Sequence, residues 1–247
     1  PIGDDAAYLY RDDVIELTEL MRQDEHNPIV YIANRILNNQ PIHAGLYGNK
    51  VLVCYEEDLT DNMILSSDIM LCGKNTTRDY WNNYIRKDLL HHYSTIPEYG
   101  ERVICRKNNH YISVNGIELS NGLIGYCISD YPLIHTKIFK MDFLPDMSDA
   151  PFIDLTCNYE YFSSPPKVRA NYNNPYITAE RFEFAYCIST HLSQGSEANR
   201  GIYIKEYLFK DMQQRIDYTA VTRFKDRMIF VLPKPRKYFY FNNQKTT

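Results

Sequence analysis

The segment that decides the fold is FAYCISTHLSQGSE, residues 184–197, in which an apolar run leads directly into a polar loop. The run at 184–188 predicts a buried β-strand, and residues 202–204 predict the next strand. Residues 211–224 have helical spacing, and the apolar run at 228–232 predicts a further strand. Strands that alternate with helices are typical of a parallel α/β sheet.

The first part of the chain has the same alternation. Asn27 followed by Pro28 predicts a helix start, because asparagine caps helices and proline is favoured at the first helical position. Apolar runs at 14–17, 51–54 and 69–72 predict strands, and the helical spacing of apolar residues between 76 and 91 predicts a second helix.

From about residue 100 to 170 the pattern changes to short β-like runs separated by turns. Asn115-Gly116 and Asn121-Gly122 are strong turn dipeptides, and no helical period is evident. We therefore expect a compact antiparallel barrel inserted into the α/β domain. The predicted division is an α/β lobe at 1–99 and 176–247, with the barrel and its exit linker at 100–175.

Composition limits the class of protein. Of the 247 residues, 44% are hydrophobic and 23% charged, which is ordinary for a globular chain with a real core. Apolar runs stay below the roughly 18 residues that span a bilayer, and no signal peptide is evident, so we expect an intracellular protein without membrane contact. The formal net charge of -4 excludes an overall basic surface but leaves room for a local nucleic-acid groove.

The six cysteines are scattered, without the close pairs of a zinc site or a disulfide framework. Most have apolar neighbours, which predicts buried free thiols and no metal site.

Gly73-Lys74-Asn75-Thr76 imitates a phosphate-binding loop, because it follows a predicted strand and precedes a helix. The true loop needs an earlier glycine where Asp68 stands, and serine or threonine where Asn75 stands. The chain also has no GxGxxG, HExxH or GxSxG motif. It therefore cannot cradle a nucleoside triphosphate by itself.

Two segments carry a family resemblance. Residues 189–197 resemble motif V of the RecD-like and Dda-like DNA helicases, T-x-H-K-[SA]-Q-G-x-[ES], and residues 218–223 resemble their motif VI, Y-[TV]-[AG]-[VL]-[ST]-R. Their order and spacing also match. Other matching segments are motif IV at 17–23, the "TN-x-TR" strand and helix at 72–86, the barrel strand and hairpin at 100–104 and 121–125, and the end of motif III at 1–4.

The resemblance covers nearly the whole chain but only the second half of such an enzyme. It implies a RecA-like lobe that lacks the P-loop and carries an inserted SH3-like β-barrel. The motifs that bind most of the ATP and Mg²⁺ would lie in an N-terminal lobe upstream of Pro1. The intact protein would be a monomeric, cytoplasmic helicase of a bacterium or phage that moves 5′ to 3′ along single-stranded DNA, and the chain alone would be inactive.

The resemblance also assigns roles. Arg22 and Arg223 would stabilise the charge on the transferred phosphoryl group, a role that suits the permanently charged, forked guanidinium. Gln194 and Gly195 would line the nucleotide cleft, and Glu197 would accept a hydrogen bond from the ribose. For each arginine the alternative is a surface ion pair, and for Glu197 it is a solvated loop carboxylate.

Ser189 and His191 would contact the DNA backbone or connect DNA to nucleotide, while Asn75, Thr76 and Thr77 would offer polar groups to phosphates at a helix start. The alternatives are a structural histidine and plain helix capping.

The sequence departs from motif V at two positions, Ser189 for threonine and Leu192 for lysine. The second change removes a cation and weakens the case for tight DNA binding. The alternative to a helicase half is a DNA-binding or scaffold module that has lost its motor partner and has no ATPase of its own. A different phosphate-handling enzyme is disfavoured by the missing P-loop motif.

Overall fold

The computed structural model describes residues 27–129, 138–146, 148–163 and 179–234, without the side chains of 163, 210 and 211. The predicted strand at 14–17, the motif IV segment with Arg22, the motif III remnant and the linker at 171–175 all lie outside these ranges.

A six-stranded sheet organises the first unit, which we call the lobe, in the order β1-β2-β13-β12-β3-β11. Neighbouring strands are parallel except for the antiparallel pair β1–β2. The strands are β1 (Gly45–Tyr47), β2 (Val51–Tyr55), β3 (Ile69–Cys72), β11 (Cys187–Ser189), β12 (Ala198–Ile204) and β13 (Phe224–Leu232). The predicted parallel α/β sheet is confirmed.

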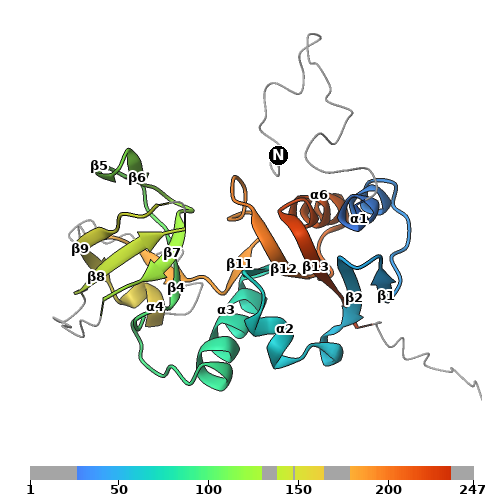
Figure 1. Cartoon of the computed structure of the whole chain (residues 1–247), viewed down its shortest axis with the longest axis horizontal. Helices are drawn as coiled ribbons and strands as arrows, with labels where there is room; N and C mark the ends of the chain where they lie inside the picture. The colour runs from blue at the N-terminus through green and yellow to red at the C-terminus, as the bar shows by residue number, and fades with distance from the viewer. Residues whose placement is uncertain (1–26, 130–137, 147, 164–178, 235–247) are drawn as a thin grey trace, which may run out of the picture.

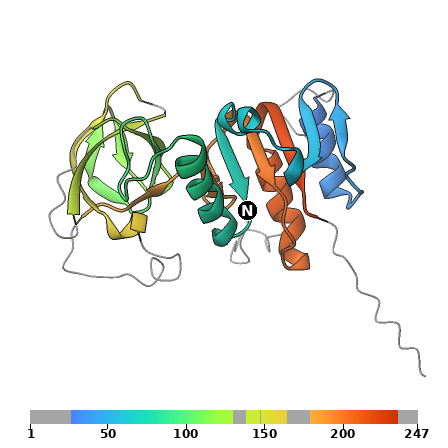
Figure 2. The ribbon, with the colours of Figure 1, turned by 90° about the horizontal axis from the view of Figure 1, so that it is seen from below.

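Helices cover both faces of this sheet, as Figures 1 and 2 show. On one face lie α1 (Pro28–Leu37) and α6 (Lys210–Val221). On the other lie α2 (Asp61–Leu65) and α3 (Asn75–Tyr84), and α3 continues into the π-helix η3 (Ile85–Leu89). The 3-10 helix η2 (Glu56–Asp58) follows β2.

Local sequence explains these elements. The Asn27 side chain accepts a hydrogen bond from the Ile29 amide at 3.0 Å, so the predicted cap of α1 is confirmed. Strand side chains alternate between the faces: Leu71 packs in the cluster with α1 and α6, and Cys72 in the cluster with α2 and α3. Two hydrophobic layers therefore enclose the sheet.

The inserted segment forms a second unit built mainly of β-strands, which we call the β unit. Its sheet has the order β10-β4-β7-β8-β9, and every neighbouring pair is antiparallel. The elements are β4 (Arg102–Cys105), the hairpin β5 (Asn109–Val114) and β6 (Ile117–Leu119), β7 (Ile124–Cys127), β8 (Ile138–Pro145), β9 (Phe152–Asn158), the short helix α4 (Glu160–Ser163) and β10 (Phe182–Phe184). Asn115 and Gly116 both have positive φ, as their turn signal predicts.

The sheet of the β unit curls back on itself. The Glu180 amide donates to Thr156 O at 2.7 Å, and the Asn158 amide donates to Glu180 O at 2.9 Å. The segment leading into β10 therefore pairs with β9 at the opposite end of the strand order. The predicted antiparallel insertion is present, while its assignment to the SH3-like class stays a prediction.

One predicted strand is wrong. The apolar run at 184–188 is divided between two sheets, because β10 pairs with β4 in the β unit and β11 pairs with β3 in the lobe. The return to the lobe thus occurs after Phe184, later than the predicted boundary at residue 176. Apolar periodicity does not reveal this change of sheet, since both hydrophobic cores accept the same side-chain types.

All six cysteines are free and buried, as predicted. Among the described helices, none is long and apolar enough to cross a membrane.

Candidate nucleotide and DNA site

The loop at residues 190–197, here the β11–β12 loop, crosses the sheet from one edge to the other. It leaves β11 at Ser189, which is in register with Cys72 at the carboxyl end of β3. It reaches β12 at Ala198, whose amide donates to Arg223 O at 3.0 Å just before β13 begins. Because β3, β11, β12 and β13 are parallel, one loop joins the carboxyl edge of the sheet to the amino edge.

Polar residues from two neighbouring strands meet at the carboxyl edge. Thr190 anchors the loop there, since its amide and its hydroxyl both donate to Cys72 O, at 2.8 and 3.1 Å. Ser189 is buried and His191 is exposed. Helix α3 begins at the same edge with the exposed residues Asn75 and Thr76.

The start of α3 is capped by a residue that the sequence did not single out. Glu206 Oε2 accepts hydrogen bonds from the amides of Gly73 and Lys74, both at 2.8 Å. The Thr77 hydroxyl donates to Glu206 Oε1 at 2.5 Å. A lysine side chain has no acceptor, so the N-cap residue Lys74 cannot make these contacts itself. The hydroxyl of Thr77 therefore serves helix capping here.

Glycine at position 73 leaves room for this approach. A Cβ on Gly73 would lie 2.7 Å from Leu208 Cδ1 and 3.3 Å from Glu206 Oε2, so the ends of these two side chains would have to shift. The sequence holds no local signal for this contact. Glu206 follows β12, and only the sheet order brings its segment beside the end of β3.

Arg223 lies at the amino edge. Its Nη1 donates to Ser196 O at 3.4 Å and its Nε to Thr219 O at 3.3 Å, so the guanidinium lies between the end of α6 and the β11–β12 loop. Glu197 forms an ion pair with Lys225, the second residue of β13, and both side chains are more than a third exposed. Two of the residues predicted to face a nucleotide, Arg223 and Glu197, thus lie at the same edge of the sheet. Arg22 lies outside the described residues.

The loop between its two ends is braced internally. Ser193 is buried and donates to Thr190 O at 2.8 Å, and Ser196 donates to Ser193 O at 2.9 Å. Gln194 and Gly195 are exposed, and Gly195 has φ +88°, a conformation that favours glycine. Short hydroxyl side chains thus shape the turn of the loop.

Helix α6, which carries the segment resembling motif VI, is held to the sheet by a buried carboxylate. Asp217 accepts a hydrogen bond from the Tyr203 hydroxyl at 2.5 Å and forms an ion pair with Lys205 Nζ at 2.8 Å. Burial and the adjacent Asp217 carboxylate raise the pKa of the Tyr203 phenol well above its usual value, so the tyrosine stays a donor. These contacts set the position of α6 on β12.

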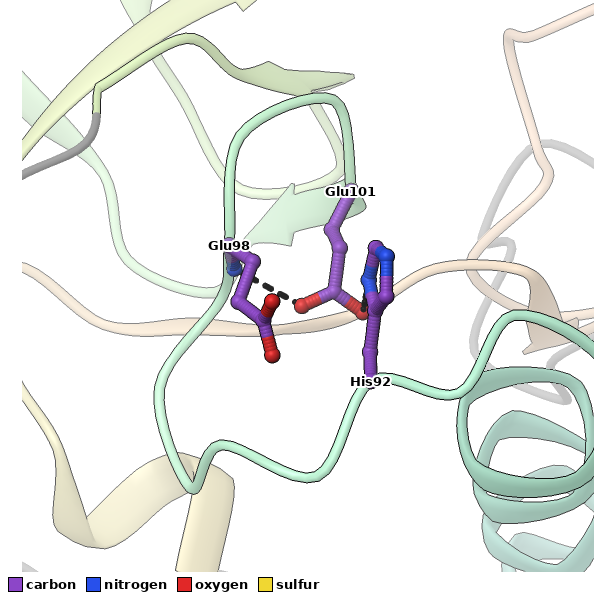
Figure 3. Close-up of side chains that lie close together, drawn as sticks. All are labelled: His92, Glu98 and Glu101. Atoms are coloured by element: carbon purple, nitrogen blue, oxygen red, sulfur yellow. Dashed lines mark hydrogen bonds and ion pairs between the residues drawn. The ribbon is translucent and has the colours of Figure 1, made fainter.

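A buried ionic cluster lies where the lobe meets the β unit (Figure 3). Glu101 is fully buried, and both of its carboxylate oxygens accept hydrogen bonds from the Arg86 guanidinium. Nε donates to Oε1 at 2.5 Å and Nη2 donates to Oε2 at 3.0 Å. The Glu98 amide donates to Oε2 at 2.8 Å, and His92 Nδ1 lies 3.3 Å from Oε1. Arg86 also stacks over the Phe184 ring, 3.6 Å from its centroid.

His92, Glu98 and Glu101 bring possible metal-ligand atoms within 4.8 Å of one another. The donor set does not suit a cation, because the Arg86 guanidinium already occupies both Glu101 oxygens. The cluster is therefore a structural ion pair that joins the π-helix η3 of the lobe to the start of the β unit.

No family description matches the sequence, and no curated protein matches it. Solved structures do: a Pif1 helicase described in a study of DNA unwinding at forked double-stranded DNA aligns with a TM-score of 0.51 at 18% identity, over 89% of this chain and 52% of that one. A Pif1 helicase from Bacteroides in complex with ADP-AlF3 and single-stranded DNA aligns with a TM-score of 0.49 at 15% identity, over 89% and 54%.

The chain thus spans about half the length of the solved chains that it matches. The likeness is one of fold, since the sequences share less than a fifth of their residues. The lobe and its inserted β unit have the fold of one half of a Pif1 helicase.

Proposed function

We propose that this chain is the second RecA-like lobe of a superfamily 1 DNA helicase of the RecD-like and Dda-like group, with an SH3-like insertion. It works with an ATPase lobe that carries the P-loop and holds most of the ATP and Mg²⁺, and the pair moves 5′ to 3′ along single-stranded DNA. The observation that carries this proposal is the β11–β12 loop, which joins an edge with exposed polar groups to an edge with Arg223 and Glu197.

At the amino edge, Arg223 supplies positive charge to the transferred phosphoryl group. The carbonyl oxygens of Thr219 in α6 and Ser196 on the loop accept from the guanidinium and fix it at the end of α6. Glu197 accepts a hydrogen bond from the ribose after exchanging its ion pair with Lys225, an exposed pair that costs about 1 kcal/mol or less to break. Gln194 and Gly195 line the same cleft from the exposed turn of the loop.

At the carboxyl edge, the exposed groups of Asn75, Thr76 and His191 contact backbone phosphates. Ser189 is buried, so its role is to connect this edge to the loop, and Thr77 acts through the cap that it shares with Glu206. Such contacts read the DNA backbone and leave the base sequence unread.

A titration of labelled single-stranded oligonucleotides with the 247-residue chain tests the proposal. We expect weak binding that is indifferent to base sequence, falls with added salt because counterions are released, and is weakened further by Asn75→Ala with Thr76→Ala. Asn62→Ala, an exposed asparagine on α2, is the matched control and should bind like the parent chain.

An ATPase assay accompanies the titration and should show no turnover by the chain alone, because the sequence contains no P-loop motif. Robust ATPase activity of the purified chain would overturn the proposal. Tight, salt-independent binding would favour the second candidate, a DNA-binding or scaffold module, which the missing P-loop motif also fits.

A further inference from the structure

We propose that Leu192 is a positioning residue that fastens the β11–β12 loop to the inserted β unit. The position is one where motif V of the resembled helicases has lysine. The contact itself is independent of any assigned activity, whereas its consequence for DNA and nucleotide binding rests on the proposed function.

Packing carries the inference. Leu192 is half-buried and packs against the hydrophobic cluster that lies under α1 and α6. Most of that cluster belongs to the lobe, but Ile104 on β4 and Ile124 on β7 come from the β unit. Both are buried, with 1% and 7% of their surface exposed. Leu192 therefore packs against a hydrophobic cluster that contains side chains of both units.

The backbone supports the same contact. Gly122 lies in the turn between β6 and β7, with φ +95°. A Cβ on Gly122 would stand 3.9 Å from Leu192 O, at ordinary van der Waals distance. The β11–β12 loop thus approaches the β unit with its main chain as well as with the Leu192 side chain.

Leu192 lies between the two ends of the loop. Thr190 ties one end to Cys72 in β3, and Ser196 meets Arg223 at the other end. A lysine at this position would place its charge beside apolar side chains or turn it toward solvent, and either arrangement gives up the packing. Leucine lacks the charge of lysine and packs against the hydrophobic cluster instead. The position of the β unit therefore sets the geometry of both ends of the loop.

Hydrogen exchange of the 247-residue chain without DNA tests the attachment. The amides of Ser193 and Ser196, which donate to Thr190 O at 3.2 Å and Ser193 O at 3.1 Å, report on the loop. In Leu192→Ala and, independently, in Ile124→Val within the β unit, these amides should exchange roughly tenfold faster or more, because the packing that holds the loop closed is lost. Leu192→Met keeps the apolar volume and should retain protection.

Leu59→Ala is the matched control, a half-buried leucine that packs against the cluster under α2 and α3 instead. It should leave the exchange of Ser193 and Ser196 unchanged. Circular dichroism confirms that each variant stays folded, and Ile124→Val, the smallest change, keeps the test valid if Leu192→Ala does not fold. Unchanged exchange in both Leu192→Ala and Ile124→Val would overturn the proposal.

Titration with a labelled oligo(dT), with an unlabelled oligonucleotide as the control, then measures the consequence for DNA binding. Leu192→Ala should weaken binding several-fold without changing its dependence on salt, because no charge is removed, and Leu192→Met should restore it. A changed salt dependence in Leu192→Ala would contradict the positioning role. If the parent chain binds no DNA while the exchange results hold, the proposed function fails and the attachment stands.

Discussion

Arg223 Nη1 lies 3.4 Å from the backbone oxygen of Ser196, and the Ala198 amide donates to Arg223 O at 3.0 Å. The end of α6 and the β11–β12 loop are thus joined through both side chain and main chain. Residues that are far apart in the sequence, and that resemble two separate helicase motifs, form one local structure. A displacement of the loop must therefore displace the guanidinium.

Replacement of Arg223 by alanine tests the role of that guanidinium. In the chain combined with the ATPase lobe that the proposed function requires, Arg223→Ala should lower DNA-stimulated ATP hydrolysis by about 10³-fold or more, the range of arginine fingers, while ATP binding weakens far less. Steady-state ATPase rates and nucleotide titration measure the two effects. Arg227→Ala, on β13, which begins directly after Arg223, and with a 68% exposed side chain, is the control and should have near-parental turnover. Near-parental turnover in Arg223→Ala would make the arginine purely structural.

The buried pair of Arg86 and Glu101 should dominate the stability of the junction between the units. Arg86→Ala leaves the fully buried Glu101 carboxylate without its cation and should lower the free energy of unfolding by about 3–5 kcal/mol. Urea denaturation measures the loss. Lys140→Ala removes the exposed pair with Asp154 and should cost about 1 kcal/mol or less. Equal losses of unfolding free energy in Arg86→Ala and Lys140→Ala would show that the buried pair does not stabilise the junction.

The cap provided by Glu206 should stabilise α3. Glu206→Ala leaves the amides of Gly73 and Lys74 and the Thr77 hydroxyl without their acceptor, and should lower the free energy of unfolding by about 1–2 kcal/mol. The same urea experiment measures it. Glu57→Ala, an exposed glutamate paired with Lys234, should change the stability little. A Glu206→Ala chain as stable as the Glu57→Ala chain would refute the capping role.

Alkaline conditions should destabilise the fold through its buried thiols. Burial raises the pKa of Cys54 and of Cys105 to about 11. In the unfolded chain these thiols ionise near their ordinary pKa, so the thiolate form favours unfolding. Their stabilising contribution is complete below the ordinary thiol pKa and is lost as the pH rises toward about 11. Urea unfolding at about pH 8 and about pH 10 should show the decrease, and Cys54→Ala with Cys105→Ala should reduce it. A pH-independent difference between the variants would contradict this assignment.

Much of the lobe could be predicted from local sequence. Asn27-Pro28 marks a helix start because its chemistry is local, and the apolar runs of β2 and β3 mark strands because buried parallel strands are apolar along their whole length. The two motif-like segments singled out Arg223 and Glu197, and the fold brings their segments to the same edge of the sheet.

Long-range contacts could not be predicted in this way. The division of 184–188 between two sheets depends on which partner strand is nearby, and an apolar run carries no record of its partner. Glu206 caps α3 only because β12 lies beside β3, a consequence of sheet order. The sequence marked Leu192 as a departure from a motif, but its packing against a cluster that both units share required the fold.

The pairing of β4 with β10 has a consequence for how such a chain can change. These are the first and last strands of the β unit, and the Ala185 amide donates to Arg102 O at 2.9 Å, so the points where the chain leaves and rejoins the lobe are neighbours. The two ends of the insertion are therefore as close together as the two ends of a short hairpin would be. Domains of other sizes and origins can be exchanged at this point without stretching the sheet, provided that their ends are equally close.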